Sequence, residues 1–141
     1  MRRSCERATH HGRLVRVCGA LRRGGRAANL RGFRGASAFR EQARQARWSG
    51  EAAWIPLGDL DLGLGFENHT SFPAPGEILL YSGGYSETEI LFPYGGTRFA
   101  SIVGQLAGNH FLTITEGREH LRELGQLVLW EGAQDIVFER T

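Results

Sequence analysis

Residues 77–92 read Glu77-Ile-Leu-Leu-Tyr-Ser-Gly-Gly-Tyr-Ser-Glu-Thr-Glu-Ile-Leu-Phe92. Each end of this stretch carries the aliphatic and aromatic residues typical of strands, and the glycines between them suit a hairpin loop. The stretch therefore predicts two strands, 77–81 and 87–92, the second of which ends at the Pro93-Tyr-Gly-Gly96 turn. A fold built outward from this hairpin is mainly β.

Further extended segments flank the hairpin on both sides. They are rich in β-branched or aromatic residues and are bounded by glycine or proline. Residues 59–65 differ, because their leucines alternate with aspartate and glycine, which indicates a half-buried strand or an extended arm. The other predicted strands are 48–57, 110–115 and 135–140.

One helix is predicted over residues 117–131. Leu121, Leu124 and Val128 share one helical face, and Gly132 follows at the C-terminal cap position. Gly125 inside the helix costs about 1 kcal/mol relative to alanine. Short strands with glycine turns and one helix predict a small β-barrel or sandwich that the helix closes.

The charges divide the chain of 141 residues into two parts. Residues 1–47 carry 13 Arg against 2 Glu, whereas residues 48–141 carry 4 Arg against 13 acidic residues. Only 7 of the first 47 residues are Val, Leu, Ile or Phe, against 28 of the last 94. We therefore expect residues 1–46 to be disordered or irregular and residues 47–141 to form the single folded domain.

Several explanations of the arginine-rich segment stay open. Arg, Gly and Ala make up 27 of its 47 residues, a mixture that GC-rich DNA yields when it is read out of frame. A solvated tail, a mitochondrial presequence and an arm that binds nucleic acid are the alternatives. Phe33 and Phe39 are its only aromatic residues, which disfavours nucleic acid as a partner.

The composition excludes several classes of protein. No apolar run approaches the roughly 18 residues that a membrane-spanning helix needs, so we expect a cytoplasmic protein without a membrane contact. Two cysteines, Cys5 and Cys18, are too few for a disulfide scaffold or a multi-cysteine zinc site. The paired glycines show no phosphate-loop pattern, and we expect no cofactor.

Five sequence runs in the acidic part occur together and in a fixed order. They resemble a bacterial family of uncharacterised proteins with a cyclophilin-like β-barrel, over about residues 46–141. The resemblance implies that fold, with opening strands and a helix that residues 1–45 do not match. A barrel missing those strands would have exposed edges through which copies could form a homo-oligomer. The runs are Arg47-Trp-Ser-Gly-Glu51, Phe66-Glu-Asn-His-Thr70, Pro73-Ala-Pro-Gly-Glu77, Ser86-Glu-Thr-Glu-Ile-Leu-Phe92 and Gly104-Gln-Leu-Ala-Gly-Asn-His-Phe111.

Glu87 and Glu89 are the leading candidates for acid–base chemistry. Residues at i and i+2 of a strand lie on the same face about 7 Å apart, where two carboxylates could share a proton in an enclosed site. The alternative is a solvated outer face. Arg98 is one of four arginines in the acidic part, and it could bind a carboxylate ligand or pair with a nearby glutamate.

The other candidates lie at loops and strand ends, where functional groups are common. His69 could act as a general base, while Glu67, Asn68, His110, Tyr81 and Tyr94 could bind substrate. The alternative for each is a structural role in loop hydrogen bonding or core packing, which is the commoner outcome for Glu67, Asn68, His69 and His110. No spacing supports a metal site that joins His69 to His110.

Together these observations favour a cyclophilin-like domain that binds or transforms a small carboxylate-bearing metabolite at the mouth of the barrel. The alternative is a peptidyl-prolyl isomerase-like module that binds peptides. More remote are an arginine-rich nucleic-acid binder and, by resemblance, an opine-forming condensing enzyme of the cucumopine and mikimopine type. A shared fold does not carry a function by itself.

Overall fold

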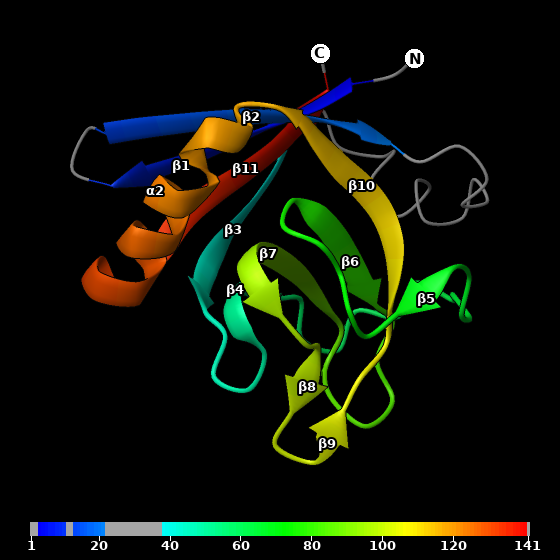
Figure 1. Ribbon diagram of the computed structural model, residues 1–141. Coiled ribbons are helices and arrows are strands. Elements are labelled where there is room, and N and C mark those ends of the chain that lie inside the picture. The colour runs from blue at the N-terminus through cyan, green and yellow to red at the C-terminus, as the bar shows by residue number, and fades with distance from the viewer. Residues whose placement is uncertain (1–2, 11–12, 22–37, 141) are drawn as a thin grey trace.

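The computed structural model describes residues 3–10, 13–21 and 38–140 of the chain. Short and long strands dominate these residues, and a single helical segment precedes the last strand (Figure 1). The strands are β1 (Arg3–His10), β2 (Arg13–Leu21), β3 (Ala38–Gln45), β4 (Gly50–Pro56), β5 (His69–Thr70), β6 (Glu77–Tyr81), β7 (Glu89–Thr97), β8 (Ala100–Ser101), β9 (Gly104–Gln105), β10 (Gly108–Glu116) and β11 (Gln134–Arg140).

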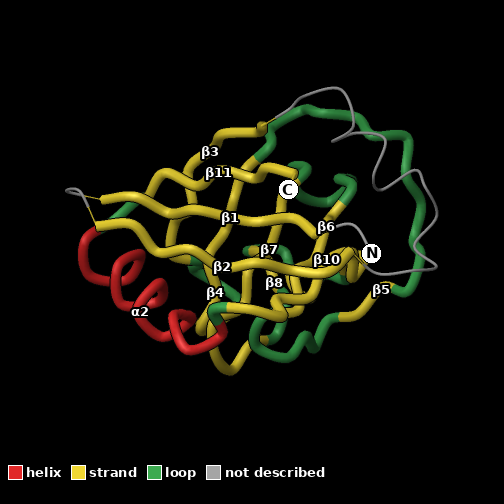
Figure 2. Tube along the Cα trace, turned by 90° about the horizontal axis from the view of Figure 1, so that it is seen from above, coloured by secondary structure: helices red, strands yellow, loops and turns green. Residues whose placement is uncertain are grey.

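The main sheet curls into a barrel. Its strand order is β2-β1-β11-β3-β4-β7-β6-β10-β5, and a further antiparallel pairing joins β2 to β10. This last pairing closes a ring of eight strands, with β5 attached outside the ring along β10. Figure 2 shows β1, β2 and β11 running side by side across one side of the molecule. β8 and β9 form a separate small hairpin.

The predicted hairpin is confirmed. β6 pairs antiparallel with β7, with Leu79 opposite Leu91. β7 nevertheless continues past Pro93 to Thr97 instead of ending at the predicted turn. Pro93 has no N–H to donate, and it lies where the register between β4 and β7 shifts, an irregularity that accommodates a proline within a strand.

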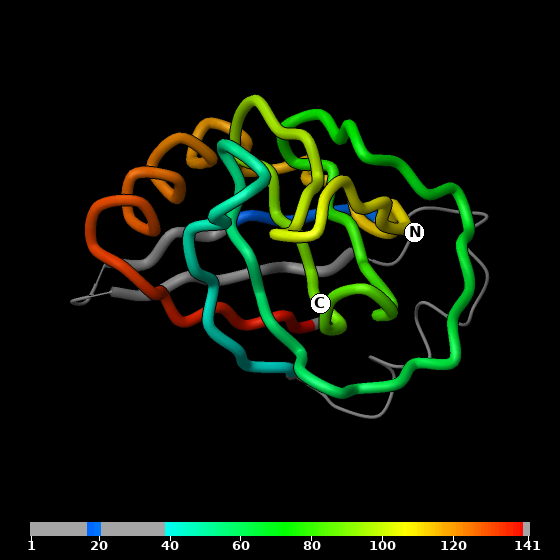
Figure 3. The backbone as a smooth tube through the Cα atoms, turned by 90° about the horizontal axis from the view of Figure 1, so that it is seen from below, coloured from blue at the N-terminus to red at the C-terminus, as the bar shows by residue number. Residues whose placement is uncertain are grey.

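Residues 57–68 form an extended arm without strand pairing among the described residues. Leu62 and Leu64 pack against the core, as the alternation of leucines predicts, whereas Leu60 at the start of the arm departs from it and is exposed. The arm runs around one flank of the barrel (Figure 3). Of the two alternatives for this segment, the arm is therefore the observed one.

Ahead of residue 46, where charge and low apolar content predict a disordered or irregular segment, the described residues form β1, β2 and β3. The remainder of that segment, residues 1–2, 11–12 and 22–37, lies outside the described residues. A strand in an antiparallel sheet pairs through its backbone and needs apolar side chains on no more than one face. A segment with a low apolar content can therefore still form strands. Val17 of β2 is 4% exposed and belongs to the core.

The wall of the barrel is apolar on both faces between β4 and β6. Ile90 and Phe92 of β7 belong to the cluster that fills the interior. Leu91, which points the opposite way, belongs to a second cluster with Leu79 and Trp54 packed beside it. We call this second group the outer cluster; its buried members are Ala46, Ala52, Leu79, Tyr81, Leu91, Phe99 and Leu106.

The predicted helix is confirmed as a continuous helical segment. It begins as the 3₁₀ turn η1 (Arg118–His120), continues as α2 (Leu121–Gln126) and ends as the π-helical turn η2 (Leu127–Glu131). Leu121, Leu124 and Val128 pack into the interior cluster. The helix thereby covers one end of the barrel (Figures 1 and 2).

Close packing explains the glycine inside this helix. A Cβ atom added to Gly125 would lie 2.3 Å from Cδ2 of Tyr94 on β7. We expect Gly125→Ala to lower the free energy of unfolding by about 1–3 kcal/mol through overpacking, in spite of the better helix propensity of alanine. Urea denaturation measures this change. Gly65→Ala is the matched control, since no atom lies within 4 Å of its added Cβ; equal stability of the two variants would contradict the packing argument.

Candidate functional site

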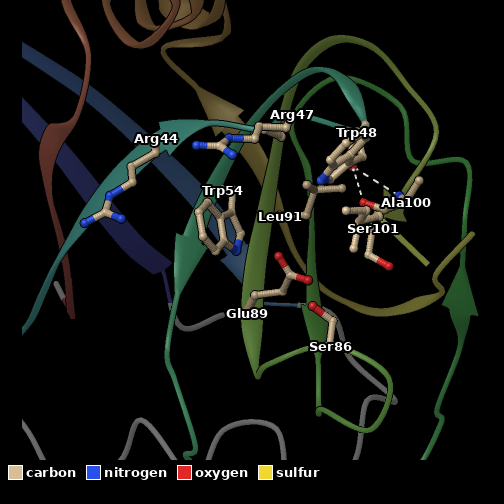
Figure 4. A pocket seen from close by; sticks show the side chains of 12 residues that line it. Arg44, Arg47, Trp48, Trp54, Ser86, Glu89, Leu91, Ala100 and Ser101 are labelled. Carbon is tan, nitrogen blue, oxygen red and sulfur yellow. Dashed lines mark hydrogen bonds between the residues drawn. The ribbon is translucent and has the colours of Figure 1, made fainter. Parts of the chain in front are cut away.

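A cavity of about 350 Å³ lies on the outer face of the barrel wall, beside the outer cluster (Figure 4). We call it the outer cavity. Its lining combines two tryptophans, two arginines, three serines and one buried carboxyl group. The lining residues are Arg44, Ala46, Arg47, Trp48, Ser49, Trp54, Ser86, Glu89, Leu91, Ala100, Ser101 and Ile102.

Strand register places the central side chains of the outer cavity. Trp54 of β4 lies opposite Leu91 of β7. Glu89 precedes Leu91 by two residues, so both side chains lie on the same face of β7. Because neighbours on one face of a sheet stand close together, the indole ring and the carboxyl group border the same space. In Figure 4 the Glu89 side chain extends from β7 into the cavity beside Trp54.

A buried serine holds the two edges of the cavity together. The Ser49 hydroxyl donates to the Ala100 carbonyl oxygen at 3.1 Å and accepts from the Ala100 N–H at 3.1 Å. The backbone N–H of Arg98 also donates to the Ser49 carbonyl oxygen. These bonds fix the segment that carries Trp48 against the β8–β9 hairpin, which contributes Ser101 and Ile102 to the lining.

Glu89 is the electrostatically unusual group of the outer cavity. Its residue is 6% exposed. Burial, reinforced by the neighbouring Glu87 carboxylate and opposed by a hydrogen bond from Ser86, raises the pKa of Glu89 to about 7. Among the described residues, ion pairs join His120 to Glu119 and Glu123, and Glu89 takes part in none. The carboxyl group is therefore present in both protonation states near neutral pH.

The remaining lining divides into an aromatic part and a cationic part. Trp48 is 53% exposed and stands at the rim, while Trp54 is partly buried against the outer cluster. Arg44 and Arg47 are exposed, and in the view of Figure 4 Trp54 lies between Arg44 and Glu89. A molecule in this cavity would meet aromatic faces, a carboxyl group and guanidinium groups.

Of the residues predicted from the sequence, Glu89 lines the outer cavity. Glu87 is exposed, precedes β7, and acts on Glu89 through its charge. Arg98 is exposed and is not part of the cavity lining. Tyr81 is buried in the outer cluster, where its hydroxyl accepts from the Tyr85 N–H. Tyr94 packs on the helix side, and its hydroxyl donates to Gln45.

The loop candidates gather in a hydrogen-bond network of their own, outside the lining of the outer cavity. The buried Asn109 side chain accepts from the Glu67 N–H at 2.7 Å and donates to the Gly65 carbonyl oxygen at 2.9 Å. Asn68, which has a positive φ of 43°, donates its amide to the His110 carbonyl oxygen. His69 is exposed, and its ring packs against the Phe66 ring in a tilted arrangement. The buried His110 ring contacts the Thr113 hydroxyl.

This network ties the extended arm to β10, and Asn109 makes its two central bonds. We expect Asn109→Ala to lower the free energy of unfolding by about 2 kcal/mol, because it leaves the Glu67 N–H without its acceptor. Urea denaturation measures the loss, and limited proteolysis should cut residues 57–68 faster. Unchanged stability together with an unchanged cleavage rate would contradict this role for Asn109.

Sequence reasoning missed the arginines, tryptophans and serines of the lining. Arg47, Trp48 and Ser49 lie in one of the five family-like runs, which was the available signal. Arg44 and Trp54 had no signal, because a single strand does not show which of its faces another layer covers. The β8–β9 hairpin provides that layer from about fifty residues farther along the chain.

The described part of the chain carries neither a metal-ligand cluster nor a membrane-spanning helix. There, no group of three or more His, Cys, Asp or Glu side chains is arranged to hold a metal ion. The described residues contain one helical segment, residues 118–131. It lacks the length and hydropathy that a membrane-spanning helix needs.

Comparison with known proteins identifies the fold. The model of a family described as "Protein of unknown function (DUF3830)" matches residues 27–139. No curated protein sequence matches the chain. Among solved structures, McbB in complex with tryptophan is similar, with a TM-score of 0.68 and 15% sequence identity. The match covers 96% of this chain but 44% of McbB, so the chain spans less than half of that protein's length. The likeness shows a cyclophilin-like fold, as the sequence resemblance implied.

Proposed function

The chain belongs to the DUF3830 family, and on this premise we propose that its outer cavity binds a small molecule with a carboxylate group and an apolar or aromatic body. The observation that carries the proposal is the enclosed Glu89, a buried carboxyl group that lines a cavity together with two tryptophans and two arginines. The volume of about 350 Å³ lies in the range of small-molecule sites.

Each part of the lining has a chemical role in this proposal. Arg44 and Arg47 hold the carboxylate, since a guanidinium group matches its two oxygens. Trp48 and Trp54 contact the apolar body. Glu89, with a pKa of about 7, can accept or release a proton at neutral pH, which suits a general acid–base group. The tryptophan bound to McbB is itself a carboxylate with an aromatic body, which supports this ligand class on the shared fold.

The cyclophilin-like fold does not by itself favour the peptidyl-prolyl isomerase alternative, because one fold supports many activities. Saturable acceleration of isomerisation in a short Xaa-Pro peptide would favour it. A cavity that combines guanidinium groups with a buried carboxyl group favours the small-molecule proposal instead.

Titration with 3-phenylpropanoate tests the proposal. Fluorescence of Trp48 and Trp54 reports binding, and a Trp130→Phe background removes the tryptophan that lies outside the cavity. We expect saturable binding that Arg47→Gln weakens about tenfold, the loss of roughly one charge-assisted hydrogen bond. Arg98→Gln is the matched control and should bind with unchanged affinity. Absence of binding, or equal weakening by both substitutions, would overturn the proposal.

A further inference from the structure

The charges that line the outer cavity have opposite signs at different places. Arg44 and Arg47 supply two cations, and Glu89 supplies the acidic group. A ligand with a carboxylate alone would satisfy the arginines and would leave the Glu89 carboxyl group facing an apolar part of the ligand. When Glu89 is ionised, such an arrangement leaves a buried charge without a countercharge, which costs desolvation free energy.

Glu89 lacks a protein cation as a partner within the described residues, as shown above. A buried carboxylate is stabilised by an opposite charge and by hydrogen-bond donors. The Ser86 hydroxyl supplies one such donor. A positively charged group on a bound ligand would provide the countercharge that the described residues do not supply.

The aromatic lining points to the same type of group. Trp54 borders Glu89 on one face of the sheet, and Trp48 stands at the cavity rim. Indole rings attract cations to their faces, most strongly where water is excluded. The hydroxyls of Ser86 and Ser101 add acceptors for the N–H groups of an amine. Carboxylate, aromatic faces and hydroxyls together form the environment that binds an ammonium group.

We infer that the ligand of the outer cavity carries a protonated amine as well as a carboxylate, with the amine held by Glu89 and Trp54 and the carboxylate by Arg44 and Arg47. This inference rests on the proposed function and names its substrate class: a zwitterion with an apolar body, such as an amino acid or an N-substituted amino acid. Glu89 then acts as the residue that selects the amine.

Three probes of similar size separate the two charged groups. L-Phenylalanine has both, 3-phenylpropanoate lacks the amine, and 2-phenylethylamine lacks the carboxylate. At pH 8, where Glu89 is ionised, we expect phenylalanine to bind about tenfold more tightly than either partial analogue, measured by calorimetry. Glu89→Gln should remove the advantage of phenylalanine over 3-phenylpropanoate, whereas the control Glu87→Gln at an exposed position should keep it.

A pH series on the unmodified protein tests the same point without a substitution. The advantage of phenylalanine should shrink as the pH falls from 8 to 5.5, because Glu89 then becomes protonated. Equal affinity for phenylalanine and 3-phenylpropanoate at pH 8, with both affinities depending on Arg47, would contradict the inference that the ligand carries an amine. The proposal that the cavity binds a carboxylate would still hold. Failure of all three probes to bind, or binding whose affinity is unchanged by Arg47→Gln, would contradict both the proposed function and the inference about the amine.

Discussion

The Glu89→Gln variant is expected to be more stable than the unmodified protein at alkaline pH. Burial raises the pKa of Glu89 from its ordinary value of 4.5 to about 7 in the folded protein. The folded state therefore holds its proton more tightly than the unfolded state, and ionisation destabilises the fold as the pH rises through this interval. Glutamine is never ionised and avoids this loss.

The stability difference between the two proteins should depend on pH in a defined way. It should be close to zero near pH 4.5, grow between pH 5 and 8, and reach about 3 kcal/mol above pH 8. Urea denaturation across this range measures it. Glu87→Gln is the control, because this exposed residue affects Glu89 only through its charge and should change stability by less than about 0.5 kcal/mol. Parallel stability curves for the Glu89→Gln and unmodified proteins would contradict the buried position of Glu89.

A chain that consists of residues 38–141 is expected not to fold as a stable monomer. This truncation removes β1 and β2, which pair with β11 and β10 in the closed ring. It also removes Val17 from the interior cluster. Two long unpaired edges template association between chains. Size-exclusion chromatography with light scattering should show oligomers or aggregates, and circular dichroism should show no cooperative melting.

A single substitution tests the same closure with the chain left whole. A Cβ atom added to Gly19 of β2 would lie 2.9 Å from the Thr113 carbonyl oxygen and 2.9 Å from Cδ1 of Leu112 on β10. Gly19→Ala should therefore lower the free energy of unfolding by about 1–3 kcal/mol. A truncated chain that is monomeric and melts cooperatively, together with a neutral Gly19→Ala, would show that the barrel does not depend on β2.

The parts of the fold that were predicted correctly are those whose residues show a local periodicity of apolar side chains. The hairpin of residues 77–92 and the helix of residues 117–131 each contain their own signal, in alternation or in helical spacing. The role of β2 left no such signal, because pairing through the backbone is independent of apolar content. The continuation of β7 past Pro93 also depends on a partner, since the register shift against β4 accommodates it.

Some residues of the candidate site were likewise predictable from a local pattern, whereas others depend on segments that are distant in the sequence. Glu89 was predicted from its place on a strand, but the sequence could not show that the β8–β9 hairpin covers this face. Arg98 was predicted because arginine is rare in its part of the chain, and it lies outside the lining of the outer cavity. Arg44 and Arg47, which line the cavity, belong to the segment in which arginine is commonest.

Nuclear magnetic resonance of the tryptophan indole N–H groups tests the central claim most directly. Three tryptophans give three resonances, and Trp→Phe substitutions assign them. If the outer cavity is the binding site, adding 3-phenylpropanoate or L-phenylalanine shifts the signals of Trp48 and Trp54 in a saturable manner and leaves Trp130 on the helix unchanged. Binding that shifts Trp130 alone, or that leaves all three signals in place, would contradict the assignment of this cavity as the functional site.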